Sequence, residues 1–71
     1  MSKRDILLRR IEEYVRSCDD LAITYIEVAE HFSISPSYAS QLLQLFANTH
    51  SNEYVYWRGV LTRKKVEAAH D

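Results

Sequence analysis

Apolar side chains recur every three to four residues through the first two thirds of the chain, a spacing typical of helices with one buried face. This pattern predicts a first helix over residues 3–17, which Ser2 opens as a cap. It predicts a second helix over 25–32, where Thr24 begins a T-x-x-E capping box. A third helix is predicted over 36–46, followed by a loop.

The connection between the second and third predicted helices is very short. Only Ser33 and Ile34 lie between the second helix and Ser35, which caps the third helix. Pro36 then takes the first helical position, where a missing N–H costs nothing. We expect Ile34 to fill the corner between two helices that a tight turn joins, as in a helix-turn-helix.

Small residues stand where these two helices should cross. Ala29 lies on the second helix, and Ala39 begins the apolar stripe of the third, which continues with Leu42, Leu43 and Phe46. Because alanine has a minimal side chain, the two backbones can approach closely at these positions. The sequence therefore predicts a close helix crossing at Ala29 and Ala39.

The stretch over residues 24–46, TYIEVAEHFSISPSYASQLLQLF, resembles the helix-turn-helix of winged-helix DNA-binding proteins. The resemblance covers about a third of the chain directly. It implies one domain over residues 1–71 of the α+β class, mostly α, with three helices and a short C-terminal β-hairpin wing. It also implies a brief first strand at residues 21–23 and a third helix that reads the DNA major groove.

The predicted wing spans residues 54–63, where β-branched and aromatic residues flank Arg58 and Gly59. A two-residue turn with positive φ explains the position of the only glycine, although a single bent strand with a bulge at Gly59 is an alternative. Alternation places two residues on each face of the first strand. We expect Val55 and Trp57 to close the core and Tyr54 and Tyr56 to lie outside. The tail, 64–71, continues the strand or starts a helical turn.

The third helix carries an unusual exposed face, because no Asp, Glu, Lys or Arg occurs between residues 33 and 52. Exposed helix faces normally carry charged pairs. Glutamine can pair with adenine through two hydrogen bonds, and serine can serve several bases. The alternative is a polar face that simply contacts water. We expect base reading by the uncharged side chains outside the apolar stripe, Ser37, Tyr38, Ser40, Gln41 and Gln44.

Basic residues cluster on the hairpin and at its exit. Cations there would hold DNA phosphates while the third helix reads bases. The alternative is an ordinary solvated strand end. The predicted phosphate-binding residues are Ser35, Arg58, Arg63, Lys64 and Lys65.

Composition narrows the function classes. A chain of 71 residues makes one small domain, and its limited core favours a homodimer. The net charge of −1 argues against a protein that coats DNA by electrostatics alone. The single Cys18 excludes an internal disulfide and fits a reducing, cytoplasmic compartment. No apolar run approaches the roughly 18 residues that a membrane span needs.

Catalytic and cofactor motifs are missing from the sequence. Glu27, Glu30 and His31 approach an inverted zinc motif, but glutamate stands where the first histidine ligand is required. A single glycine excludes a phosphate-binding loop, and no serine has an activating partner motif. We therefore expect no enzyme activity, no metal, no cofactor and no small-molecule substrate.

The expected function is sequence-specific binding of double-stranded DNA by a transcriptional regulator. The alternative is a winged-helix module that binds another protein and not DNA. The low net charge supports that alternative. So do three apolar residues beyond the needs of a minimal core, Ile6, Leu8 and Leu45.

Overall fold

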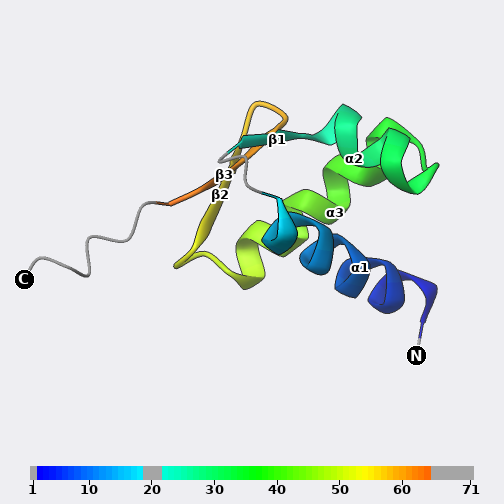
Figure 1. The fold of residues 1–71 in the computed structure, drawn as a ribbon, viewed down its shortest axis with the longest axis horizontal. Coiled ribbons are helices and arrows are strands. Elements are labelled where there is room, and N and C mark those ends of the chain that lie inside the picture. Colours follow the sequence, from blue (N-terminus) through cyan, green and yellow to red (C-terminus); the bar gives the residue numbers. More distant parts are fainter. Residues whose placement is uncertain (1, 19–21, 65–71) are drawn as a thin grey trace, which may run out of the picture.

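The computed structural model describes residues 2–18 and 22–64, which form three helices and a three-stranded antiparallel sheet (Figure 1). This confirms the predicted α+β class, mostly α, with a C-terminal hairpin. The helices begin as predicted, but the third extends three residues beyond the predicted end at 46. The elements in chain order are α1 (Lys3–Ser17), β1 (Ala22–Thr24), α2 (Tyr25–Phe32), α3 (Pro36–Thr49), β2 (Tyr54–Trp57) and β3 (Val60–Arg63).

Side-chain caps fix the start of every helix. The hydroxyl of Ser2 accepts from the Asp5 amide at 3.2 Å, and that of Thr24 accepts from the Glu27 amide at 3.1 Å. The Glu27 carboxylate does not return to the cap, because it accepts a hydrogen bond from the Tyr14 hydroxyl at 2.7 Å. The predicted capping box is therefore half formed, and its acid links α1 to α2.

The turn between α2 and α3 is as short as the sequence predicts. Ser33 adopts a left-handed conformation with φ of 56°, and the Ile34 amide donates to the Ala29 carbonyl at 3.0 Å. Ile34 is half-buried against the core. Ala29 and Ala39 are 3% and 0% exposed on two helices that pack together. These positions confirm that small residues lie inside the α2–α3 contact.

The sheet has the order β1-β3-β2, so the last strand in the chain lies in the middle. Arg58 and Gly59 form the two-residue turn of the hairpin, with φ of 52° and 81°. This confirms the hairpin and excludes the single bent strand. A Cβ atom at Gly59 would lie 2.8 Å from the Tyr25 ring, so both the backbone and the space require glycine. The predicted strand residue Leu21 and the tail after Lys64 lie outside the described residues.

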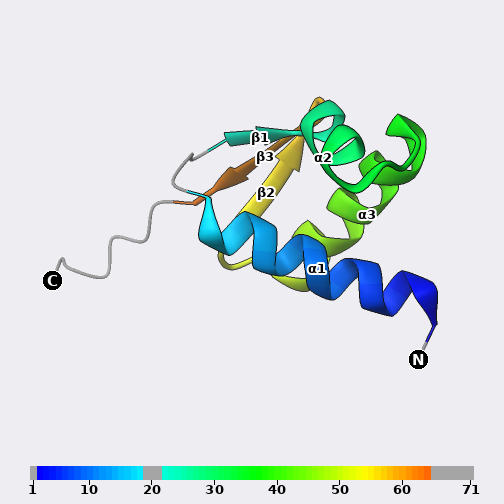
Figure 2. The same cartoon turned by 45° about the vertical axis from the view of Figure 1, so that its right-hand side comes forward.

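The core lies between the helices and one face of the sheet (Figure 2). Leu61 on the central strand is 1% exposed, and Ile23 beside it on β1 is 2% exposed. The opposite face of the sheet carries Val55 and Trp57, which are 44% and 67% exposed. The helices contribute the remaining apolar core residues, Ile11, Val15, Val28, Ala29, Ala39, Leu42, Leu43, Phe46 and Ala47.

The predicted faces of β2 were wrong, although the alternation itself was right. Tyr54 is 3% exposed and packs against Phe46 with ring centroids 5.0 Å apart, whereas Val55 and Trp57 point to solvent. The turn register explains the inversion, because it sets Tyr56 opposite the buried Leu61. Residues opposite each other in a sheet share a face. Both tyrosines of β2 therefore face the helices.

Candidate nucleic-acid interface

A groove of about 600 Å³ separates the N-terminal half of α3 from the hairpin turn. We call it the α3–hairpin groove. Among the described residues that line it, Arg58 is the only charged one, and none carries a carboxylate. The remaining polar side chains are hydroxyls and one amide, which can both donate and accept hydrogen bonds, and the single charge is positive. The lining residues are Tyr25, Pro36, Ser37, Ser40, Gln41, Tyr56, Arg58 and Gly59.

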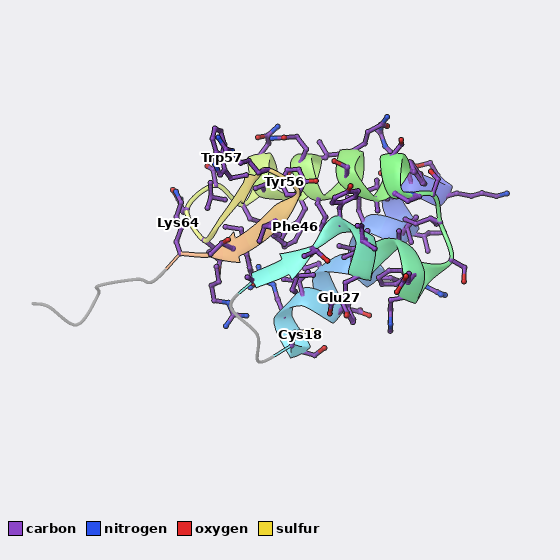
Figure 3. The ribbon with its side chains drawn as sticks, turned by 90° about the horizontal axis from the view of Figure 1, so that it is seen from above. Cys18, Glu27, Phe46, Tyr56, Trp57 and Lys64 are labelled. Carbon is purple, nitrogen blue, oxygen red and sulfur yellow. The ribbon has the colours of Figure 1, made fainter. Side chains whose placement is uncertain are left out.

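Two contacts hold the walls of the groove together. The Tyr25 amide, at the start of α2, donates to the Gly59 carbonyl at 3.0 Å. The hydroxyls of Ser40 on α3 and Tyr56 on β2 share a hydrogen bond of 2.6 Å. Figure 3 shows Tyr56 lying between the hairpin and α3, while Trp57 projects away from the body of the protein. The hairpin is therefore attached to α2 through its turn and to α3 through β2.

The structure divides the five predicted base-reading residues into different environments. Ser37 and Gln41 are exposed and line the α3–hairpin groove. Ser40 also lines it, but its hydroxyl is held by Tyr56. Tyr38 is half-buried against the core. Gln44 is exposed outside the groove, where its amide donates to the Asn48 side chain at 3.4 Å. Ser37 and Gln41 are thus the two with both exposure and a place in the groove.

The predicted phosphate-binding residues lie at two separate places. Arg58 occupies the turn, with its guanidinium carbon 5.6 Å from the centre of the Trp57 ring. Arg63 and Lys64 lie at the other end of the hairpin, roughly 10–14 Å away at the usual rise per residue. There Arg63 donates to the Tyr54 hydroxyl at 3.3 Å, and the Lys64 ammonium donates to the Ser51 carbonyl at 2.7 Å.

The two remaining residues predicted to bind phosphate are Ser35 and Lys65. The Ser35 hydroxyl accepts from the Tyr38 amide at 3.1 Å, so it serves first as the cap of α3. Lys65 lies outside the described residues. The groove therefore contains one of the predicted cations, Arg58, rather than a cluster.

Acidic side chains gather at the far side of α1 and around the loop before β2. Arg16 bridges the Glu12 and Glu53 carboxylates, each at 3.0 Å. The hydrogen bond from Arg16 lowers the pKa of Glu53, and the hydrogen bonds to Glu53 and Glu12 raise the pKa of Arg16. On α2, the hydrogen bond to the Glu27 carboxylate raises the pKa of Tyr14. These carboxylates already have partners, and none of them lines the α3–hairpin groove.

Sequence reasoning missed Tyr25 and Tyr56 as parts of this site and placed Trp57 in the core. The signal for Tyr56 was present, because a two-residue turn at Arg58 and Gly59 fixes its pairing with Leu61. No comparable signal exists for Tyr25. Its place in the groove depends on the approach of α2 to the hairpin turn, which is a tertiary contact.

Two histidines, His31 and His50, pack at helix ends. His31 stacks on Tyr14 with ring centroids 4.3 Å apart, and His50 caps the end of α3 beside Phe46. Within residues 2–18 and 22–64, no three His, Cys, Asp or Glu side chains come together as a metal-binding group. Over the same part of the chain, none of the helices has the length and apolar character that a membrane crossing requires.

Comparisons of the chain with protein-family models, with curated proteins and with solved structures found no match.

Proposed function

We propose that this chain is a winged-helix protein that binds double-stranded DNA sequence-specifically and regulates transcription. The observation that carries the proposal is the α3–hairpin groove. The exposed side chains of Ser37 and Gln41 and the cation of Arg58 border one cavity, and no carboxylate of residues 2–18 or 22–64 lines it. Base-reading groups and a phosphate-binding group would therefore meet the same segment of DNA.

In the proposed complex, the N-terminal half of α3 enters the major groove, as recognition helices commonly do. Gln41 then offers a donor and an acceptor to one adenine edge, and Ser37 offers a hydroxyl one turn earlier. Arg58 contacts the phosphate backbone beside the groove. The order of the elements supports this arrangement, because a hairpin follows the helix pair and flanks α3.

The net charge of −1 is compatible with DNA binding because charge is unevenly distributed. Glu12, Glu27 and Glu53 are engaged by Arg16 or Tyr14, away from the α3–hairpin groove. Each phosphate that the protein neutralises steepens the logarithmic salt dependence by about 0.9. We therefore expect moderate affinity with a shallow, measurable salt dependence.

The direct test is a titration of isotope-labelled protein with duplexes of mixed sequence, followed through backbone amide signals. We expect shifts at the first two turns of α3 and at Arg58 and Gly59. Trp57 is the only tryptophan and lies beside the turn, so its fluorescence gives an independent signal. Shifts confined to α1, or none at all, would contradict the proposal.

A homodimer remains part of the proposal. If two copies bind about a two-fold axis, the preferred site should be a near-palindrome with half-sites about 34 Å apart or a multiple of that distance. Sedimentation of the protein with and without DNA measures the stoichiometry. A one-to-one complex would remove the dimer and the palindrome but would leave the α3–hairpin groove as the DNA site.

One observation favours a second function, the binding of another protein. The outer face of the hairpin exposes 44% of Val55 and 67% of Trp57. Exposed apolar patches often mark protein interfaces. Of the three additional apolar residues that the sequence suggested for such an interface, only Ile6 is well exposed, at 44%. Leu8 packs against the core, and Leu45 is half-buried. Salt-dependent binding of duplex DNA separates the two functions, since an apolar docking surface would respond little to salt.

A further inference from the structure

The hydrogen bond between Ser40 and Tyr56 joins the two halves of the proposed DNA site. Ser40 lies on α3 beside Gln41, and Tyr56 lies on β2 two residues before Arg58. The 2.6 Å bond is half-buried and spans 16 residues of sequence. Within residues 2–18 and 22–64, no other side-chain to side-chain hydrogen bond connects α3 with the hairpin. It is therefore a specific link between the helix and the strand that carry the two kinds of DNA contact.

The backbone provides a second attachment for the hairpin turn, but to a different helix. The Tyr25 amide donates to the Gly59 carbonyl at 3.0 Å, and the Tyr25 ring fills the space beside Gly59. This contact fixes the turn relative to α2. At the far end of the hairpin, Tyr54 packs against Phe46 of α3. Near the turn, the distance between α3 and the hairpin depends on the packing of Tyr56 and on its hydroxyl bond to Ser40.

We propose that the Ser40–Tyr56 hydroxyl pair holds α3 and the hairpin at one fixed separation, so that Gln41 and Arg58 engage the same DNA segment together. Ser40 is then a positioning residue and not a base-reading residue. The inference rests on the proposed DNA binding and deepens it. It also explains why a hydroxyl on the exposed side of α3 is turned toward the protein.

The physical reason is the advantage of two linked contacts. Once α3 is bound, a rigidly held Arg58 meets its phosphate as an intramolecular event with a high effective concentration. A hairpin that moves relative to α3 must be ordered during binding, and that ordering lowers affinity. Removing one hydroxyl leaves the Tyr56 ring in place. The coupling can therefore be weakened without removing apolar contacts of the fold.

The experiment compares Tyr56→Phe and Ser40→Ala with the wild-type protein in DNA titrations at several salt concentrations. We expect both variants to lose roughly 3- to 10-fold in affinity, the worth of one hydrogen bond. The salt slope should fall by about one unit as the Arg58 contact is uncoupled. Preference for the chosen site over scrambled DNA should persist, because Gln41 is unchanged.

Three controls distinguish positioning from a general structural effect. Ser40→Thr keeps a hydroxyl and should restore both affinity and salt slope. The double variant should be no weaker than either single variant, as expected for two partners of one bond. Tyr14→Phe removes a hydroxyl from another half-buried tyrosine, on α1, whose hydrogen bond to Glu27 lies away from the groove, and it should change neither quantity.

A measurement on the free protein tests the coupling without DNA. In Tyr56→Phe, the backbone order parameters of Arg58 and Gly59 should fall below about 0.85, the value of rigid backbone. Unchanged order parameters together with an unchanged salt slope would overturn the inference. Loss of site preference in Ser40→Ala would also overturn it, because that result makes Ser40 a base reader. If the wild-type protein binds no duplex, the proposed function fails, and the free-protein measurement alone decides the coupling.

Discussion

Helices α1 and α3 have similar lengths, but their exposed sides differ in charge. They contain 15 and 14 residues, and each buries an apolar stripe in the same core. The exposed side of α3 carries no charged residue at all. The exposed side of α1 carries Lys3, Arg4, Asp5, Arg9, Arg10, Glu13 and Arg16.

This difference shows that the uncharged face of α3 is a local feature and not a result of composition. Charged residues make up 27% of the chain, so their absence from a long helix and its flanks needs a reason. Charged side chains lose more hydration than neutral ones when a ligand covers them. A neutral polar face is therefore suited to close contact with base edges, whereas α1 is suited to water.

The largest expected effect comes from the buried side of α3. Ala39 is fully buried at the contact with α2, so Ala39→Leu forces three additional carbons into a packed space. We expect a loss of about 1–3 kcal/mol in the free energy of unfolding. Gln44→Leu, which adds the same side chain on the exposed face, should cost far less. Urea denaturation of both variants measures the difference, and equal stabilities would show that Ala39 has room around it.

The next largest effect is expected from the exposed side of α3, where the glutamines are proposed to read bases. Gln41→Ala and Gln44→Ala should leave stability nearly unchanged, since both side chains are exposed. Gln41→Ala should cost about 1–3 kcal/mol on the preferred DNA site and little on scrambled DNA, and Gln44→Ala, whose side chain lies outside the groove, should cost less. Equal losses on both DNAs would mean that the glutamines only orient the helix. No loss on either DNA would favour the protein-binding function.

A pair of arginine variants compares the two surfaces directly. Arg58→Ala should weaken binding to all duplexes alike and lower the salt slope by about one unit. Arg9→Ala removes the same charge from the exposed side of α1 and should leave the slope unchanged. Titrations over a range of salt concentrations give both slopes. An equal change in the two variants would indicate attraction by overall charge and not by a defined site.

The smallest expected effect concerns pH and the ion pairs of α1. Because Arg16 lowers the pKa of Glu53 in the folded state, this pair stabilises the fold above the unfolded-state pKa. That contribution is lost as the pH falls through the lowered folded-state pKa. Glu53→Gln should therefore reduce the loss of stability between neutral pH and about pH 3. Urea midpoints of both proteins along this pH range check the effect, and parallel curves would contradict it.

The sequence was sufficient to predict the starts of the helices and the hairpin turn, because neighbouring residues determine both. The caps at Ser2, Thr24 and Ser35 place the starts of the helices, and Gly59 places the hairpin turn. The end of α3 was predicted three residues too early. Residues 47–49 carry no strong helix signal of their own, yet Ala47 is 5% exposed and packs in the core. Tertiary contact outweighed weak local preference there.

The site was predicted only in part because its geometry depends on contacts between distant residues. The absence of charge on α3 directs attention to Ser37 and Gln41, which border the groove. The Ser40 hydroxyl is bonded to the Tyr56 hydroxyl and is therefore not free to contact DNA bases. Tyr56 lies on β2, the strand whose two faces were predicted the wrong way round. Because the two faces of β2 were predicted the wrong way round, the contact between α3 and the hairpin was not predicted.

The central position of β3 has a consequence for the order of folding. Helices α2 and α3 adjoin in sequence, so their contact closes only a short loop of chain and can form early. The sheet, by contrast, pairs Ile23 with Leu61, and within residues 2–18 and 22–64 β3 is the one strand that pairs with β1. We expect a nascent chain synthesised only to Gly59 to lack β3, the strand that unites the sheet. We therefore expect the half of the groove that carries Arg58 to be completed last.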